Sequence, residues 1–321
     1  SNISDISKIY HGAAVSEPVY DKLGTGAVTV EYKIKGSDDS TYTMAKPVNV
    51  GEYALRVSVA EDNIFNAASN TADFTISYLA VPASPYTLSP VANASGWHNA
   101  DVTITPASGY TISSSLDGTY LPSITISESK AGYAVYLKSA AGQMTDGITV
   151  NEIKIDKEAP TNVTISYEKD GWKEFLNTVT FGLFFKDTIQ VKLSATDAVS
   201  GVKEFKYILD GTEYTVTAAS GSAKFSIVPQ YKGNISAIKA IDNAGNESDE
   251  IVTEYFAVDS TSPAAPTVDL NGYISETWIN SDVRFTISGA VALSGIAKYQ
   301  YSTDNGATWN DMVVNDETAA T

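Results

Sequence analysis

The chain has 321 residues, 43% of them hydrophobic, and its formal net charge of −17 comes from 38 Asp and Glu against 21 Lys and Arg. This balance argues against nucleic-acid binding, which needs clustered Lys and Arg, and against docking onto or insertion into an anionic membrane. Cysteine is absent, so disulfides and thiolate metal sites are excluded, and the length predicts about two to four domains.

Residues 1–79 are predicted to form a first β module. Apolar and polar residues alternate with period two over 28–34, 53–60 and 72–77, which is typical of half-buried strands. Proline and glycine between the first two of these strands predict a turn over 46–53.

The same module carries a spaced set of turn and aromatic residues. These are Tyr10, Gly12, Pro47, Asn49, Gly51, Tyr53, Phe74 and Ile76. Their pattern resembles the small bacterial Ig-like modules of the MBG and YDG type, over about 70 residues.

Proline-containing linkers divide the remaining chain into three further units, predicted at 80–157, 158–260 and 261–321. Proline cannot join a central ladder and stiffens a connection, so the joints between units are expected to be short and semi-rigid. Residues 188–256 alternate so regularly that they are predicted to form most of one antiparallel β-sandwich. The unit at 261–321 is expected to be incomplete.

Internal repetition indicates that these three units are copies of one module. The pattern Trp-x-Asn-x-Asp-Val occurs at 97–102 and again at 278–283. A Ser-Gly turn followed by tyrosine occurs at 200–207 and again at 294–301. The fold class expected for the whole chain is therefore all-β, with tandem Ig-like antiparallel β-sandwiches in an elongated array.

The repeated module resembles the bacterial Ig-like repeats of Gram-positive surface proteins. The resemblance rests on the linkers at 155–160 and 258–263 and on the segments at 172–185, 195–202 and 240–248. It implies an extracellular, monomeric, non-enzymatic region of an exported protein on the cell wall. Such a region acts as an adhesin stalk, spacer or adhesive module, with an extracellular or host glycan or protein as its partner.

Two alternatives stay open beside this interpretation. The chain could be a carbohydrate-binding module, or it could be an accessory Ig-like tail of a secreted glycoside hydrolase. The first predicts an exposed row of aromatic side chains. The second predicts a catalytic domain elsewhere in the full-length chain.

Catalytic constellations are not evident in the sequence. The two histidines, His11 and His98, fall in different units and have no neighbouring nucleophile of the kind that a triad requires. Acidic residues such as those at 247–250 form a run typical of a solvated loop, whereas glycosidases need two carboxylates facing each other across a cleft. We therefore expect no catalytic residue, no enzymatic activity and no bound cofactor.

Calcium is the one metal that the sequence suggests. In an Ig-type sandwich the loops after the second and sixth strands lie at one end, where the incoming linker also arrives. That arrangement brings together Asp156, Asp197, and Asp242 with Asn243, whose oxygens suit a hard cation. The simpler alternative, which we favour, is that each Asp caps its own turn.

Aromatic side chains and a covalent cross-link complete the candidates. Trp97, Trp172, Trp278 and Trp309, with Tyr110 and Tyr299, could form a sugar-stacking surface, although repeated tryptophans more often fill the same core position in each copy. Phe181, Phe184 and Phe185 are likewise expected in a core. A Lys–Asn isopeptide bond inside a sandwich is a further possibility, for which the sequence indicates no particular residues.

Overall fold

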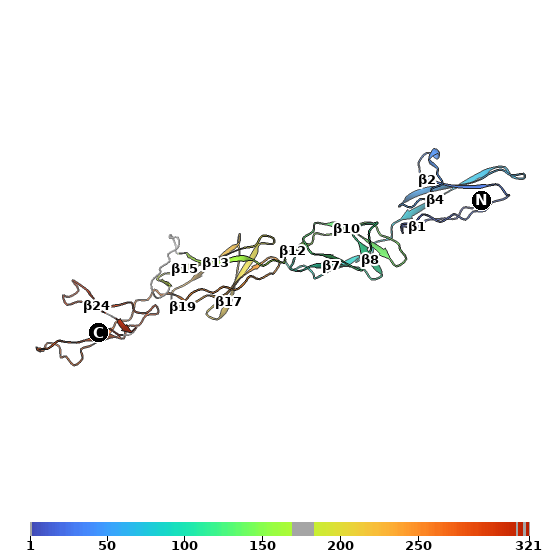
Figure 1. Cartoon of the computed structure of the whole chain (residues 1–321). Coiled ribbons are helices and arrows are strands. Elements are labelled where there is room, and N and C mark those ends of the chain that lie inside the picture. Colours follow the sequence, from blue (N-terminus) through green and yellow to red (C-terminus); the bar gives the residue numbers. More distant parts are fainter. Residues whose placement is uncertain (1, 169–182, 313, 317–318, 321) are drawn as a thin grey trace. The chain divides into compact units, whose positions relative to one another are not determined.

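The computed structural model describes residues 2–168, 183–312, 314–316 and 319–320 (Figure 1). Two compact units, 1–157 and 158–321, divide the chain. Within the described residues almost all regular structure is β, with one short 3-10 helix, η1 (Asp39–Thr41). Trp172 and Phe181 lie outside the described residues.

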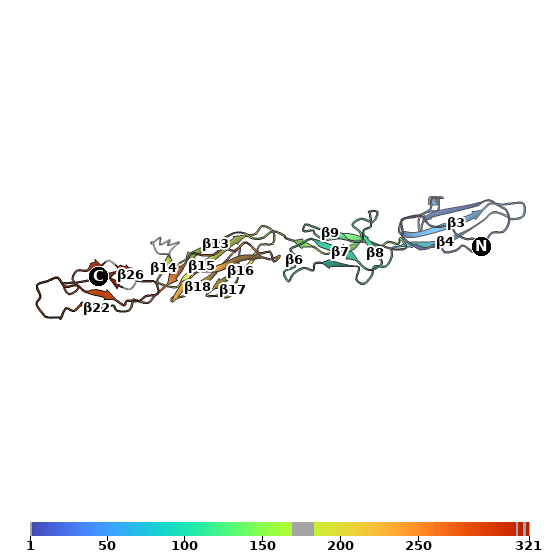
Figure 2. The ribbon, with the colours of Figure 1, turned by 60° about the horizontal axis from the view of Figure 1, so that its bottom comes forward.

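The first module is a single four-stranded sheet in the order β1-β4-β3-β2. Its two middle strands, β3 and β4, are labelled in Figure 2. Its strands are β1 (Lys8–Ile9), β2 (Val28–Ile34), β3 (Gly51–Val59) and β4 (Ala68–Ser77). β1 pairs parallel with β4, and the other pairs are antiparallel. The core on this sheet includes Tyr32, Leu55 and Ile76, each at most 1% exposed.

The second module is a sandwich of two three-stranded sheets, β5-β7-β9 and β11-β10-β8, with a separate parallel pair, β12-β6. Its strands are β5 (Tyr86–Ser89), β6 (Trp97–His98), β7 (Val102–Pro106), β8 (Tyr110–Ser113), β9 (Ile124–Ile126), β10 (Tyr133–Ser139), β11 (Ile148–Val150) and β12 (Lys154–Ile155). Apolar residues at alternate positions, such as Val135 and Leu137 on β10, meet in one core between the sheets.

Side chains of the second module also complete the core of the first. Met144, Leu116 and Tyr120 pack against the cluster that contains Tyr10 and Leu55. Because these contacts lie within the compact unit 1–157, the linker near residue 80 joins two modules that share packed surface.

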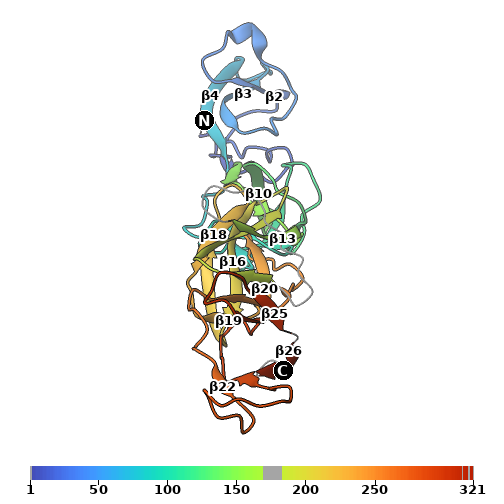
Figure 3. The ribbon, with the colours of Figure 1, turned by 90° about the vertical axis from the view of Figure 1, so that its left-hand side faces the viewer.

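The third module begins at the start of the second compact unit. Like the second module, it has a three-stranded antiparallel sheet built on its first long strand and a parallel strand pair that contains its last strand. Its strands are β13 (Thr161–Glu168), β14 (Leu183–Phe185), β15 (Ile189–Thr196), β16 (Val202–Leu209), β17 (Thr212–Thr217), β18 (Ser222–Ile227), β19 (Tyr231–Gly233), β20 (Ser236–Asp242) and β21 (Phe256–Val258). The sheets β13-β15-β18 and β17-β16-β20 enclose the core, and β14-β21-β19 forms a third sheet. Figure 3 labels one or more strands of each of these sheets.

The fourth module begins in the same way. Its strands are β22 (Thr267–Asp269), β23 (Thr286–Ser288), β24 (Tyr299–Tyr301), β25 (Asn310–Met312), β26 (Val314–Asp316) and β27 (Ala319–Ala320). The antiparallel pair β22-β23 matches β5-β7 and β13-β15 of the earlier modules. The prediction of an all-β fold built from tandem Ig-like sandwiches is thus confirmed.

Candidate functional site

Asp197 follows β15 and organises the loop that leads into β16. Its Oδ1 accepts hydrogen bonds from the backbone N–H of Gly201 at 2.6 Å and of Val199 at 3.3 Å. Gly201 has φ +79°, a conformation that favours glycine. The Asp-x-x-x-Gly spacing therefore closes a turn on its own carboxylate.

Asp242 ends β20 and closes the second loop in the same manner. Its Oδ1 accepts from the backbone N–H of Gly245 at 2.6 Å and of Asn246 at 2.9 Å, and its Oδ2 accepts from Asn246 Nδ2 at 2.8 Å. The residue is fully buried, with 0% of its surface exposed. Capping of the local turn, the simpler sequence-based interpretation, is what these bonds show for Asp197 and Asp242.

Asn243 joins the two loops to each other. Its Nδ2 donates to the carbonyl oxygens of Ser200 at 2.8 Å and Gly201 at 3.0 Å, and its backbone N–H donates to the Gly201 carbonyl at 3.0 Å. The sequence analysis placed Asn243 with Asp242 in the candidate calcium group, and the structure shows that its side-chain nitrogen joins the two loops.

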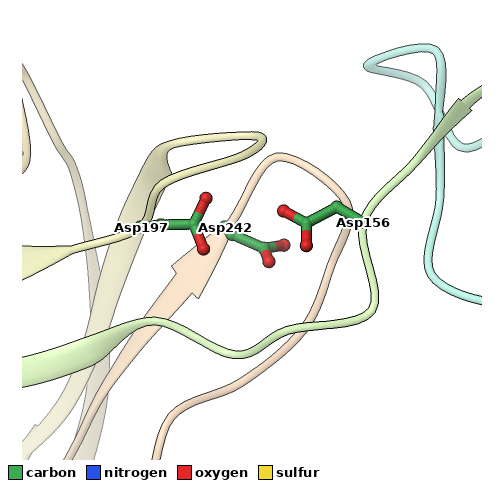
Figure 4. A group of neighbouring side chains, drawn as sticks. All are labelled: Asp156, Asp197 and Asp242. Carbon is green, nitrogen blue, oxygen red and sulfur yellow. The ribbon is translucent and has the colours of Figure 1, made fainter. Parts of the chain in front are cut away.

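Asp156 comes directly after β12, and only 2% of its surface is exposed. Among the residues that the structure describes, Asp156, Asp197 and Asp242 form a group in which one carboxylate oxygen from each residue lies within 4.8 Å of the others (Figure 4). The structure thus brings together the three carboxylates that the sequence analysis predicted to lie close to one another.

Three carboxylates this close repel one another, more strongly where water is excluded than in bulk solvent. A divalent cation among them would replace that repulsion with attraction, and Ca²⁺ takes six to eight oxygens at about 2.3–2.6 Å. The three carboxylates supply part of such a shell. Calcium binding stays a prediction, whereas the turn-capping role follows from the hydrogen bonds.

Asp259 is the linker residue of the next repeat, at the position that corresponds to Asp156. Its Oδ2 accepts from the Ser294 backbone N–H at 3.0 Å and from Ser294 Oγ at 2.9 Å. Hydrogen bonds from the backbone N–H groups of Thr261 and Ser294 hold the pKa of Asp259 below its ordinary value. Here Val291 stands where the third module has Asp197, so the linker carboxylate contacts a hydroxyl and an amide.

The sequence analysis did not predict the Asp259–Ser294 contact, although two sequence features pointed to it. The linkers at 155–160 and 258–263 are similar, and the Ser-Gly turn recurs at 294–295. Only the fold shows that the linker carboxylate reaches this turn.

The two histidines lie apart, in different environments. His11 is exposed, and its Nε2 lies 3.3 Å from Lys8 Nζ. His98 on β6 is 5% exposed, and its Nδ1 is buried without a hydrogen-bond partner. Burial lowers the pKa of His98 below its ordinary value of 6.5, against a smaller opposing effect of the hydrogen bond that its ring donates to the backbone carbonyl of Pro90.

This environment predicts acid sensitivity of the second module. Because the folded state holds His98 with a lowered pKa, the unfolded chain binds a proton first as the pH falls below 6.5. The free energy of unfolding should therefore decrease as the pH falls from 6.5 towards the folded pKa, and level off below it. Urea unfolding of the chain and of His98→Gln at several pH values measures this. His11→Gln is the control, and an equal pH dependence in the wild type and His98→Gln would contradict the assignment.

The tryptophans do not share one core position, and that sequence-based expectation is wrong for two of them. Trp97 on β6 is half-buried, with Lys154 Nζ 5.8 Å from its ring centroid. Trp278, at the matching position of the fourth module, is 101% exposed, and Trp309 is 60% exposed. The difference arises because β12 pairs with β6, whereas no strand among the described residues pairs with Trp278.

The other aromatic candidates lie against cores. Tyr299 is 5% exposed in the core of the fourth module, and Tyr110 packs against the core of the second. Phe185 packs against the core of the third module, beside Phe256. These side chains do not extend the exposed surface of Trp278 and Trp309 into a row.

Within the described part of the chain, no helix is long and apolar enough to span a membrane. No protein-family model matches the chain, and the search of curated proteins found no match.

Comparison with solved structures finds distant likenesses. Fibronectin(III)-like modules of CbhA from Clostridium thermocellum align with 17% identity and a TM-score of 0.26, covering 54% of this chain and 94% of theirs. A structure of a 1.5-MDa bacterial ice-binding adhesin aligns with 16% identity and a TM-score of 0.25, covering 77% and 89%. Immunoglobulin domains 1–5 of Sidekick-1 align with 10% identity and a TM-score of 0.22, covering 80% and 57%. Likenesses at these scores carry no argument about function.

Proposed function

We propose that this chain is a non-enzymatic repeat region of an exported cell-surface protein of a Gram-positive bacterium, in which it serves as a stalk, spacer or adhesive module. The proposal includes an MBG-like first module and an extracellular glycan or host protein as the partner. One observation carries it: three successive modules each open on an antiparallel strand pair, and these pairs are β5-β7, β13-β15 and β22-β23.

A series of repeated modules is better suited to spanning a distance than to catalysing a reaction. Each sandwich is closed by its own core, and the repeats are joined by short segments such as 156–160 and 259–266. A series of closed modules adds length with each copy, and its stability is set by each module and its neighbours. The hollows lined by residues 27–69, 32–53 and 270–284 are open to solvent, and none of these three has a histidine in its wall to act as a base beside a hydroxyl nucleophile.

Labelling of intact cells tests the location. Antibodies raised against residues 1–321 are expected to bind unpermeabilised cells of the source organism, and external protease is expected to abolish the signal. A signal that appears only after permeabilisation would contradict the proposal. A cytoplasmic protein probed in the same way is the control for cell integrity.

Carbohydrate binding is a second candidate, favoured by the exposure of Trp278 and Trp309. Exposed aromatic faces stack on sugar rings. A glycan array probed with the wild type and with Trp278→Ala and Trp309→Ala variants tests it. Signal that both variants lose would support a binding module, whereas no signal from the wild type would leave the stalk or spacer role.

We also propose that Ca²⁺ binds Asp156, Asp197 and Asp242. Addition of millimolar CaCl₂ is expected to raise the melting temperature of the chain, and EGTA is expected to reverse the rise. Saturation at about 100 times Kd would stabilise the folded state by about 2.7 kcal/mol. Differential scanning calorimetry measures the effect.

Asp242→Asn is expected to abolish the calcium response, because it removes one of the charges that attract the cation. Asp304→Asn is the matched control. Asp304 also caps a turn, through Thr308, and has a pKa lowered to about 2, but it is not one of the three grouped aspartates. An unchanged melting temperature of the wild type in calcium would contradict the proposal.

A further inference from the structure

Tyr32 on β2 carries a hydroxyl group that is buried without a hydrogen-bond partner among the described residues. The residue is 1% exposed, and its ring packs edge-on against Phe74, with the ring centroids 6.2 Å apart. A buried hydroxyl without a partner destabilises the folded state relative to phenylalanine at the same position. Buried polar groups are nearly always paired in native proteins, so this one calls for a functional explanation.

Two hollows have this side chain in their walls. Both lie beside residues 43–47, which we call the strap, and Lys46 of the strap lines both. The first hollow, of about 410 Å³, is mainly apolar and has Pro47 and Tyr53 in its wall. The second, of about 290 Å³, is more polar and includes Glu17. A mainly apolar concave surface with a few polar groups at one place is typical of small-molecule sites.

Hydrogen bonds hold the strap in place at both ends. At one end the backbone N–H of Tyr32 donates to the Thr43 carbonyl at 2.7 Å, and the Thr43 N–H donates to the Tyr32 carbonyl at 2.9 Å. At the other end the Val15 N–H donates to the Pro47 carbonyl at 3.0 Å. The walls of both hollows are therefore preformed, so little loss of conformational entropy opposes binding.

Tyr53 gives the first hollow an aromatic wall of fixed orientation. Its hydroxyl donates to the Asn49 carbonyl at 2.9 Å, and its ring stacks on Phe74, with the centroids 5.5 Å apart. Gly51 lies so close that a Cβ at that position would be 3.2 Å from the ring. A fixed aromatic ring beside the aliphatic ring of Pro47 suits the C–H face of a sugar.

The polar part of the site combines donors with an acceptor. Lys46 Nζ lies 2.6 Å from Glu17 Oε1, and the two side chains are 35% and 64% exposed, so a ligand can reach both. Burial raises the pKa of Tyr32, with a smaller contribution from the negative charge of Glu17. The phenol and the ammonium group donate hydrogen bonds, and the carboxylate accepts them.

A hydroxyl group both donates and accepts, so a ligand hydroxyl fits this set of groups. An anion fits it less well, because the carboxylate of Glu17 repels it. A purely apolar ligand leaves the phenol of Tyr32 unpaired. The ligand that the chemistry favours is therefore neutral, with hydroxyl groups on a ring that also has a C–H face.

We propose that the two hollows beside the strap bind a neutral saccharide, with one hydroxyl group hydrogen-bonded to Tyr32 Oη and a C–H face of the sugar ring against Tyr53. The proposal rests on the proposed function, because it places the glycan partner named there in the first module. The site is separate from the exposed Trp278 and Trp309 of the fourth module. Its test uses the purified chain and does not depend on where the protein is located.

Saturation-transfer NMR of the 321-residue chain with glucose, galactose, mannose and N-acetylglucosamine is the test. Transfer to the ring C–H protons of at least one of these sugars is expected. Tyr32→Phe is expected to weaken that binding about tenfold or more, since the lost hydrogen bond is made to a buried group. Tyr214→Phe is the matched control, because Tyr214 is 44% exposed in the third module and its hydroxyl has no part in the site.

Stability measurements separate binding from a merely structural role of the hydroxyl. Without sugar, Tyr32→Phe is expected to raise the urea concentration at the midpoint of unfolding, because it removes a buried hydroxyl that has no partner. With the bound sugar in excess, the midpoint of the wild type should rise and that of Tyr32→Phe should not. Tyr214→Phe should follow the wild type under both conditions.

Four results would overturn the proposal. One is no transfer to any of the four sugars, and if antibodies still label intact cells, only this site fails and the proposed location stands. Another is equal binding by the wild type and Tyr32→Phe. The third is a lower midpoint for Tyr32→Phe without sugar, because the hydroxyl would then already have a partner such as a buried water. The fourth is binding that Trp278→Ala abolishes, because the sugar would then lie on the fourth module.

Discussion

Replacing Phe205 with alanine is expected to lower the free energy of unfolding of the third module by about 3–5 kcal/mol, the range for removing a buried aromatic ring. Phe205 lies on β16, is 0% exposed, and belongs to the core cluster that also contains Leu193 and Ile238. β16 pairs with β17 on one side and β20 on the other, so the cavity would open in the middle of a sheet that cannot easily collapse onto it.

Chemical denaturation followed by circular dichroism and calorimetry measures the loss. Val228→Ala is the matched control, because Val228 is 63% exposed in the same module and its truncation should change stability by less than about 0.5 kcal/mol. A loss below about 1 kcal/mol for Phe205→Ala would mean that this core is not closed as the structure describes. The destabilisation by Phe205→Ala is also relevant to Asp242. Asp242 caps the loop that follows β20, and β20 pairs with β16, the strand that carries Phe205.

Most of the fold that could be predicted from the sequence followed from the alternation of apolar and polar residues along the strands. In β15 buried residues alternate with partly buried or exposed ones, and apolar and polar residues alternate in the sequence in the same way. The turns that begin at Asp197 and Asp242 could be predicted equally well. Asp197 and Asp242 close turns on glycines with positive φ, which is a local property that neighbouring residues determine.

Contacts between residues that lie far apart in the sequence could not be predicted from such local patterns. The exposure of Trp278 depends on whether a strand covers it, and in the second module that strand lies more than 50 residues away from Trp97. The local pattern is identical at both tryptophans, so it cannot distinguish the covered copy from the uncovered one. The Asp259–Ser294 contact, 35 residues apart, was missed for the same reason.

The linker near residue 80 illustrates a second limit. Proline and alanine at 80–85 indicate where one module ends, but not how much surface the neighbours share. The backbone N–H of Leu79 donates to the Met144 carbonyl at 2.8 Å, and the Met144 N–H donates to the Tyr10 carbonyl at 2.9 Å. The chain thus pairs across the boundary through a residue that sequence reasoning places in the second module.

Met144→Ala is therefore expected to destabilise the first module, although the residue belongs to the second by its position in the sequence. Its side chain is 8% exposed and packs in the core with Tyr10, Leu55 and Ile76. Truncating a buried methionine costs about 2–5 kcal/mol, since the lost transfer free energy adds to that of the cavity. Met144→Leu, which conserves volume, should cost less than about 1.5 kcal/mol.

Hydrogen exchange locates the effect. In Met144→Ala the amides of β3 and β4 are expected to exchange faster than in the wild type, because opening of the first module no longer requires loss of the methionine contacts. Exchange in β15 and β16 of the other compact unit is the internal reference. Faster exchange confined to β10 and β11 would contradict the expectation, because Met144 would then stabilise only the second module. Faster exchange in both modules of residues 1–157 would mean that they open together, so that the smallest stable unit at this end of the chain is the pair of modules.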